Sequence, residues 1–63
     1  MTEEIYDNQR KRIGRIVTRS SGIQDIYDAL GNRLGEYRPN EDRTFDARGN
    51  SFGYGNQLMR LLR

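Results

Sequence analysis

Short apolar clusters alternate with clusters of turn-forming residues along this chain. Ile and Val recur in residues 13–17, Ile and Tyr recur in residues 23–27, and the residues between them, 18–22, are polar and end in glycine. Residues 38–43 carry the only proline and a run of charges. Clusters of β-branched and aromatic residues bounded in this way are typical of short strands joined by turns. The pattern therefore predicts an all-β fold.

Three segments of the chain repeat one pattern. Residues 5–14, 26–35 and 44–53 align without gaps. Each contains an aromatic residue, Asp, two variable residues, usually Gly-Asn, a polar residue, a large apolar residue and a final Gly. Because a repeat of this length is long enough for one hairpin, we predict three short antiparallel hairpins, or a meander, in a single domain that covers residues 1–63.

The repeated Asp suits the first position of a type I turn, where its side chain bonds the backbone two residues on. A glycine three residues later supplies the left-handed conformation of a G1 bulge. The turn-forming residues are Asp7, Asp28, Gly31, Asp46 and Gly49. In the first copy Arg10 stands at the glycine position, which costs on the order of 1 kcal/mol. We therefore expect the first turn to be looser or differently built.

The turn also predicts a strand register. It places Tyr27 opposite Arg33, Ile26 opposite Leu34 and Asp25 opposite Gly35. Ile26 and Leu34 would then share one face of the hairpin. On the other face Tyr27 would cover the missing side chain of Gly35.

The last residues of the chain have a different pattern. Leu58, Leu61 and Leu62 have the spacing of one helical face, and Asn56 is a candidate N-cap. A segment of about two turns does not hold as an isolated helix. We expect a short helical turn that docks on the core or on a second subunit; the alternative is an edge strand.

The size of the chain argues for self-association. Sixty-three residues lie near the lower limit for independent folding, and only 33% of them are hydrophobic. Domains of this size usually add disulfides, a metal or oligomerisation. The chain has no Cys and no His, and its carboxylates are scattered, so oligomerisation remains. We predict a homo-oligomer, a tetramer first and a dimer second. The predicted interface residues are Ile5, Ile13, Ile16, Ile26, Leu34, Phe52, Leu58, Met59, Leu61 and Leu62.

The residues most often used in acid–base and nucleophilic catalysis, His and Cys, are absent. Ser20 and Ser21 lie in a polar turn with no base nearby in sequence. The three repeated Asp residues are better explained by their turns than by a paired-carboxylate hydrolase, and the glycines lack the Gly-Lys-Ser/Thr of a phosphate loop. We therefore expect no enzyme activity, no cofactor and no metal site.

Ten of the eleven basic residues are Arg, which favours planar and stacked contacts, although a compositional bias towards Arg explains this equally well. The main basic concentration is Arg10, Lys11, Arg12, Arg15 and Arg19. With Tyr6 and Tyr27 it is a candidate surface for single-stranded nucleic acid or phosphate. A solvated or interface surface is the alternative, because Glu3, Glu4 and Asp7 lie close by in sequence. The aromatic residues of the repeat would pack rather than line a ligand site.

The run Tyr-Asp-x-x-Gly-Asn-Arg-Leu at residues 27–34 resembles the YD-repeat hairpins of Rhs-type proteins. The layout of residues 25–62 is similar to that of small bacterial proteins called the four-fold β-flower family: Asp-Ile-Tyr-Asp-Ala-x-Gly-Asn, a charged linker, Phe-Asp-Ala-x-Gly-Asn and a short apolar tail. This resemblance implies a compact β module that associates about a four-fold axis, and it implies no activity. Arg10 departs from the pattern.

Together these observations favour a self-associating structural or interaction module without catalytic activity. The alternative is a nucleic-acid-binding β module that uses the Arg-rich first hairpin. No segment reaches the length of a membrane span, and the acidic start lacks a signal-peptide apolar region. The expected location is the cytoplasm.

Overall fold

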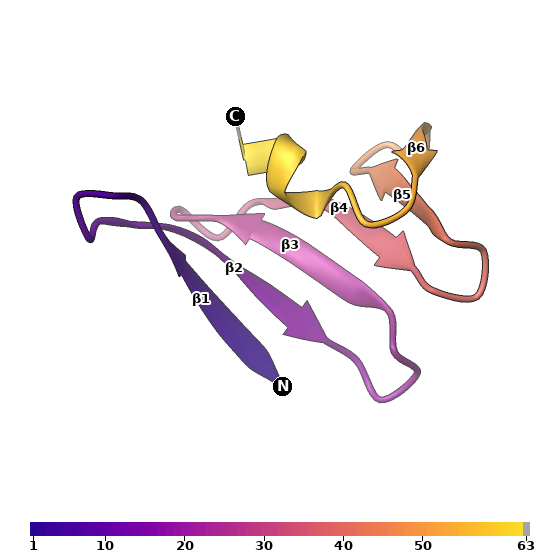
Figure 1. Cartoon of the computed structure of the whole chain (residues 1–63), viewed down its shortest axis with the longest axis horizontal. Coiled ribbons are helices and arrows are strands. Elements are labelled where there is room, and N and C mark those ends of the chain that lie inside the picture. The colour runs from indigo at the N-terminus through magenta and orange to yellow at the C-terminus, as the bar shows by residue number, and fades with distance from the viewer. Residues whose placement is uncertain (63) are drawn as a thin grey trace.

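The computed structural model describes residues 1–62, which form one antiparallel sheet of six strands arranged in chain order (Figure 1). The strands are β1 (Thr2–Tyr6), β2 (Arg12–Thr18), β3 (Gln24–Asp28), β4 (Arg33–Arg38), β5 (Arg43–Asp46) and β6 (Ser51–Tyr54). A short 3-10 helix, η1 (Leu58–Leu62), follows. The prediction of an all-β antiparallel meander with a short C-terminal helical turn is confirmed, and the tail is not an edge strand.

The three repeat hairpins have the same turn. Asp28 Oδ1 accepts hydrogen bonds from the backbone N–H groups two and four residues on, both at 2.9 Å, and Gly31 has a φ of 89°. Asp7 accepts the equivalent bonds at 2.8 and 2.9 Å, and Arg10 adopts a φ of 64°. The expectation of a differently built first turn was therefore wrong. The bonds to Asp7 accompany the same turn even where a non-glycine residue must be left-handed.

Each repeat hairpin also contains a β-bulge at its large apolar residue. Tyr27 lies opposite Arg33, as predicted, but Ile26 lies opposite Gly35 because Leu34 is the extra residue between them. The predicted Ile26–Leu34 and Asp25–Gly35 pairs were therefore wrong, and Asp25 lies opposite Glu36 instead. Because strand residues alternate between the two faces, the extra residue moves every side chain beyond the bulge to the face opposite the one predicted without it.

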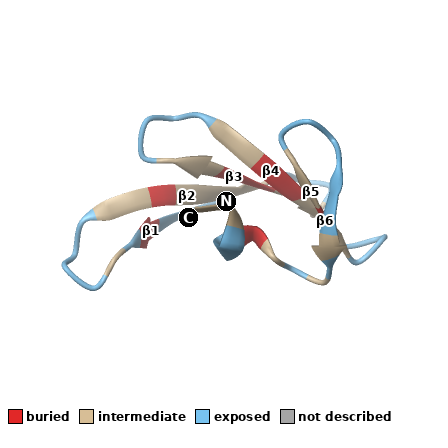
Figure 2. Ribbon diagram, turned by 90° about the horizontal axis from the view of Figure 1, so that it is seen from above, coloured by how far each residue is buried: buried red, intermediate tan, exposed pale blue. Residues whose placement is uncertain are grey.

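The core lies between the sheet and η1, which packs on one face only (Figure 2). Ile26 and Leu58 are fully buried there, and Ile5 is nearly so. The residues packed partly against them are Ile13, Ile16, Leu34, Tyr37, Leu61 and Leu62. Ile26 and Leu58, two of the predicted interface residues, are buried within one chain, because η1 folds back over β3 and β4 and encloses both side chains.

Two repeat glycines are sites of close approach to η1. A Cβ atom on Gly14 would lie 2.8 Å from Leu62 Cδ2, and one on Gly35 would lie 2.6 Å from Leu61 Cδ1. Both would also collide with a carbonyl oxygen of the next strand. It is thus Leu61, and not Tyr27 as predicted, that occupies the space beside Gly35.

The connection to η1 is held by polar contacts. The buried Thr44 hydroxyl donates to the Gly55 carbonyl at 2.7 Å and accepts from the Gln57 N–H at 2.8 Å. The Asn56 side chain accepts from the Leu58 N–H at 3.2 Å, the capping bond expected from the sequence. These bonds turn the chain out of the sheet after β6 and direct Leu58 into the core.

Candidate interaction surfaces

The face of the sheet opposite η1 is covered by no other element of residues 1–62 (Figure 2). The strand pairing brings one set of side chains together on it, and we call this set the open face. It consists of Thr2, Glu4, Tyr6, Arg12, Arg15, Val17, Asp25, Tyr27, Arg33, Glu36, Arg38, Arg43, Phe45, Ser51 and Tyr54. Its composition is unusual for a sheet surface, because charged and aromatic residues outnumber all others.

Two buried carboxylates lie at the centre of the open face. Arg19, from the turn between β2 and β3, donates two hydrogen bonds to Asp25, at 2.7 and 2.8 Å. Arg33 bridges Asp25, at 3.1 Å, and Glu36, and Arg38 pairs with Glu36 from the other side. Three guanidinium groups therefore cover two carboxylates whose residues are 4% and 7% exposed.

This network determines the ionisation of its central acid. Burial alone would raise the pKa of Asp25, but the hydrogen bonds from Arg19 and Arg33 outweigh burial and hold the pKa of that carboxyl below its ordinary value. The same bond to Asp25 raises the pKa of Arg19. Both groups are therefore charged at neutral pH, and the pair is an ion pair rather than a neutral hydrogen bond.

Two further arginines of the open face stack on aromatic rings. The guanidinium carbon of Arg15 lies 5.4 Å from the centre of the Tyr27 ring, and that of Arg43 lies 4.6 Å from the Tyr54 ring. Neither arginine pairs with a carboxylate among residues 1–62. The buried Nε of Arg15 also has no hydrogen-bond partner there. On the open face, these two arginines are the ones without a carboxylate partner among residues 1–62.

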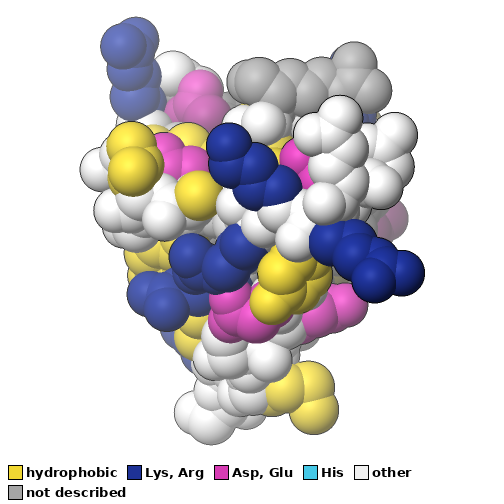
Figure 3. All heavy atoms as spheres, turned by 90° about the vertical axis from the view of Figure 1, so that its left-hand side faces the viewer, with side chains coloured by type: hydrophobic (Ala, Val, Ile, Leu, Met, Phe, Trp, Pro, Cys, Tyr) yellow, Lys and Arg dark blue, Asp and Glu magenta, His cyan; other side chains and the backbone are white. Residues whose placement is uncertain are grey.

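The basic residues predicted to form one patch are dispersed by the fold. Arg10 and Lys11 lie in the exposed turn between β1 and β2. Arg12 is paired with Glu4, Arg15 lies over Tyr27, and Arg19 is bound to Asp25 at the other end of the strands. Figure 3 shows Lys and Arg side chains on one side of the molecule, interspersed with acidic and uncharged groups. The five residues do not form a continuous basic surface.

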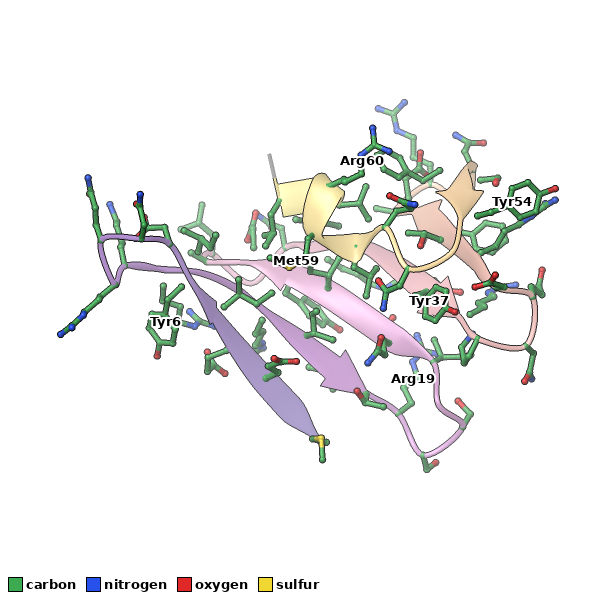
Figure 4. The ribbon with its side chains drawn as sticks, viewed as in Figure 1. Tyr6, Arg19, Tyr37, Tyr54, Met59 and Arg60 are labelled. Atoms are coloured by element: carbon green, nitrogen blue, oxygen red, sulfur yellow. The ribbon has the colours of Figure 1, made fainter. Side chains whose placement is uncertain are left out.

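The two edges of the sheet carry a second distinctive surface. β1 and β6 each have one unpaired side, and the exposed aromatic residues of the chain lie on these two strands. Tyr6 is 57% exposed on β1, and Phe52 and Tyr54 are 39% and 71% exposed on β6. The three aromatic residues of the inner strands are all partly covered. Met59, also predicted at an interface, is exposed on η1 (Figure 4).

A shallow hollow lies between the two turns that flank β3 and β4, lined by Ser21, Ile23 and residues 38–41. The Glu41 carboxylate there is paired with Arg38 at 3.3 Å.

Within residues 1–62 no three acidic side chains gather as a metal site would require. The described part of the chain also has no helix with the length and apolar character of a membrane span.

Sequence reasoning found only part of the open face, namely Tyr6, Arg12, Arg15 and Tyr27 of the predicted basic and aromatic surface. Arg33, Arg38 and Arg43 were not singled out, and Asp25 was placed opposite Gly35 rather than Glu36. The available signal was the alternation of charged and aromatic residues along β4 and β5. That signal becomes readable only when the extra residue of each bulge is known, because the bulge decides which side chains share a face.

The fold and its surfaces define a class of protein: a small antiparallel sheet with one covered face, one charged open face and two aromatic edges. No protein-family model, curated protein or solved structure matches this chain. The similarity to the four-fold β-flower family and to YD-repeat hairpins therefore remains a resemblance of motifs, and what it implies about assembly remains a prediction.

Proposed function

We propose that this protein is a self-associating structural or interaction module that performs no catalysis. The observation that carries the proposal is the small core: only three apolar side chains, Ile5, Ile26 and Leu58, are buried in the described chain. Small domains that bury so little usually gain stability from additional constraints, of which association is the one this sequence allows.

The arrangement of the sheet supports this proposal. An open antiparallel sheet leaves unpaired N–H and C=O groups along its two outer strands, and such edges readily pair with another strand. The exposed aromatic residues on β1 and β6 add apolar area where pairing would occur. The chain thus offers both backbone and side-chain contacts to a second copy.

The test is the molar mass of the purified protein by light scattering behind a sizing column, across a dilution series. We expect a mass that is a multiple of 7.4 kDa and that persists on dilution to micromolar concentration. A cooperatively folded monomer of 7.4 kDa at all concentrations would refute the proposal.

A second candidate function, binding of single-stranded nucleic acid, is favoured by Arg15 and Arg43. Both lack a carboxylate partner in the described chain and stack on tyrosine rings, an arrangement suited to phosphates and bases. Fluorescence anisotropy with a labelled oligo-dT should then show affinity that falls steeply with salt. Arg15→Glu should abolish this binding, and Arg10→Glu, in the exposed turn, should leave it nearly unchanged. Equal loss in both variants would exclude the open face as the site.

A further inference from the structure

Neighbouring repeats are joined by a strand pair, and both of these internal junctions have the same register. Where the first repeat meets the second, Gly14 lies opposite Asp28 and Arg15 lies opposite Tyr27. Where the second meets the third, Gly35 lies opposite Asp46 and the next residue lies opposite Phe45. Both junctions therefore pair the final glycine of one repeat with the turn Asp of the next, and the following residue with the repeat aromatic.

The two free edges of the sheet are the two halves of one such junction. The third repeat ends at Gly53 in β6, and Tyr54 follows it. The first repeat has its aromatic residue, Tyr6, at the end of β1 and its turn residue, Asp7, directly after β1. Figure 4 shows Tyr6 and Tyr54 at opposite ends of the molecule. β6 carries the glycine side of a junction without an Asp and aromatic residue opposite it, and the β1 edge carries the Asp and aromatic residue without a glycine opposite them.

We propose that β1 of a second copy pairs antiparallel with β6 in the register of the internal junctions. Gly53 then lies opposite the partner's Asp7, and Tyr54 lies opposite the partner's Tyr6. This inference rests on the proposed self-association and names its contact. The contact is head-to-tail, so repeated use of it closes a ring or extends a filament.

The surroundings of the repeat glycines support this register. The carbonyl that blocks a Cβ on Gly14 is that of Tyr27, and the carbonyl that blocks one on Gly35 is that of Phe45. Both belong to the aromatic residue of the next repeat. At Gly53 the nearest atom to such a Cβ is Gln57 Cγ, at 3.6 Å, and no strand of residues 1–62 lies beyond β6. The carbonyl of the partner's Tyr6 would occupy this space. The φ of 158° at Gly53 by itself favours glycine, so the presence of a glycine here is not evidence for a partner strand. The evidence is the unoccupied space beside Gly53.

Charge also favours unlike edges over like ones. β1 carries Glu3 and Glu4, so pairing two β1 strands would bring carboxylates together. The β5–β6 hairpin carries Arg43 and Arg48 against the single acid Asp46. The acidic edge therefore complements the basic hairpin, and pairing of β1 with β1 is disfavoured.

The junction is shorter than the internal ones. After Gly55 the chain leaves the sheet, because the Thr44 hydroxyl donates to the Gly55 carbonyl at 2.7 Å and accepts from the Gln57 N–H at 2.8 Å. The register thus predicts two backbone pairs and one exposed aromatic pair at each contact. A contact of this size persists on dilution only if ring closure lets every copy make two of them.

The test uses single-cysteine variants, since the chain has no native cysteine. Tyr6→Cys labelled with ¹⁵N and unlabelled Tyr54→Cys are mixed and oxidised mildly, and the disulfide-linked dimers are distinguished by their masses in non-reducing mass spectrometry. Directly opposed strand residues have Cα atoms within disulfide reach, about 4.5–5.5 Å apart. We expect the mixed disulfide to exceed either homodisulfide at least tenfold. Leu30→Cys, at an exposed turn 88% open to solvent, is the matched control and should give a statistical mixture with Tyr54→Cys.

A statistical mixture for Tyr6→Cys with Tyr54→Cys, or a dominant Tyr54→Cys homodisulfide, would overturn the head-to-tail register. If the wild-type mass remained oligomeric in that case, self-association itself would stand. As a second variant, Tyr54→Glu should reduce the mass to that of the monomer with unchanged circular dichroism, and Leu30→Glu should not. An unchanged mass for Tyr54→Glu would also overturn the inference.

Discussion

Replacement of Gly35 by Ala tests why the repeat ends in glycine. A Cβ atom at this position would lie 2.6 Å from Leu61 Cδ1, whereas carbon atoms pack best at about 3.5–4.0 Å. The Leu61 side chain or η1 would have to move by roughly 1 Å, and β4 would also have to move away from the Phe45 carbonyl oxygen, which would lie closer still to the Cβ atom. Crowding of this kind costs about 1–3 kcal/mol. The lower entropy of the unfolded Ala chain offsets about 0.4–1 kcal/mol of it.

We therefore expect Gly35→Ala to lower the free energy of unfolding by about 1–2 kcal/mol. The assay is urea unfolding followed by circular dichroism at one fixed protein concentration, because association contributes to apparent stability. The matched control is Gly49→Ala, whose Cβ would meet nothing within 4 Å and whose cost arises from its φ of 89° alone.

The two glycines differ in their coupling to Leu61. Removing the Leu61 side chain relieves one of the two close contacts at Gly35 and leaves the contact with the Phe45 carbonyl. Gly35→Ala should therefore cost about 0.5 kcal/mol less in a Leu61→Ala background. Gly49→Ala should cost the same in both backgrounds. Additive effects at Gly35 would refute the contact between this glycine and η1.

Three further outcomes follow from the structure. Leu58→Ala should cost about 2–5 kcal/mol by leaving a cavity in the core, whereas the exposed Met59→Ala should cost little in the same urea assay. Arg10→Gly should stabilise the fold by about 0.5–1 kcal/mol, because glycine adopts the φ of 64° without strain; a loss of stability would contradict this. The folded pKa of Asp25 is lowered, so its contribution is present above the unfolded pKa of about 3.9 and is lost as the pH falls through the folded pKa. Asp25→Asn should therefore flatten the acid limb of stability against pH, measured by urea unfolding at each pH.

The turns and the topology could be predicted from the sequence because they depend on local chemistry. Asp28 and Gly31 form a turn through bonds within five residues, and three copies of the pattern predict three hairpins. Asn56 was recognised as a cap for the same reason. Such features need no knowledge of the rest of the fold.

The register and most of the open face could not be predicted, because they depend on contacts between distant residues. The bulge at Leu34 shifts Asp25 from Gly35 to Glu36, and only then do the Arg19, Arg33 and carboxylate positions converge. The burial of Leu58 likewise depends on where η1 crosses the sheet. The sequence spacing indicated that Leu58 lies on the apolar face of a helical turn. It did not indicate the strand against which Leu58 packs.

The chemistry of the open face favours association through the edges over stacking of faces. Stacking would remove the remaining water from the guanidinium groups around Asp25 and Glu36, and the desolvation of buried ion pairs is rarely recovered. Edge pairing relies on backbone groups and on the rings of Tyr6 and Tyr54, which carry no charge; the exposed charges of β1 and of the β5–β6 hairpin select unlike edges but add little affinity, because exposed ion pairs are weak. Salt weakens partly exposed ion pairs but not apolar contacts. The mass of the assembly should therefore be the same at about 0.1 M and about 1 M salt. Dissociation in high salt would show instead that the arginines hold the copies together.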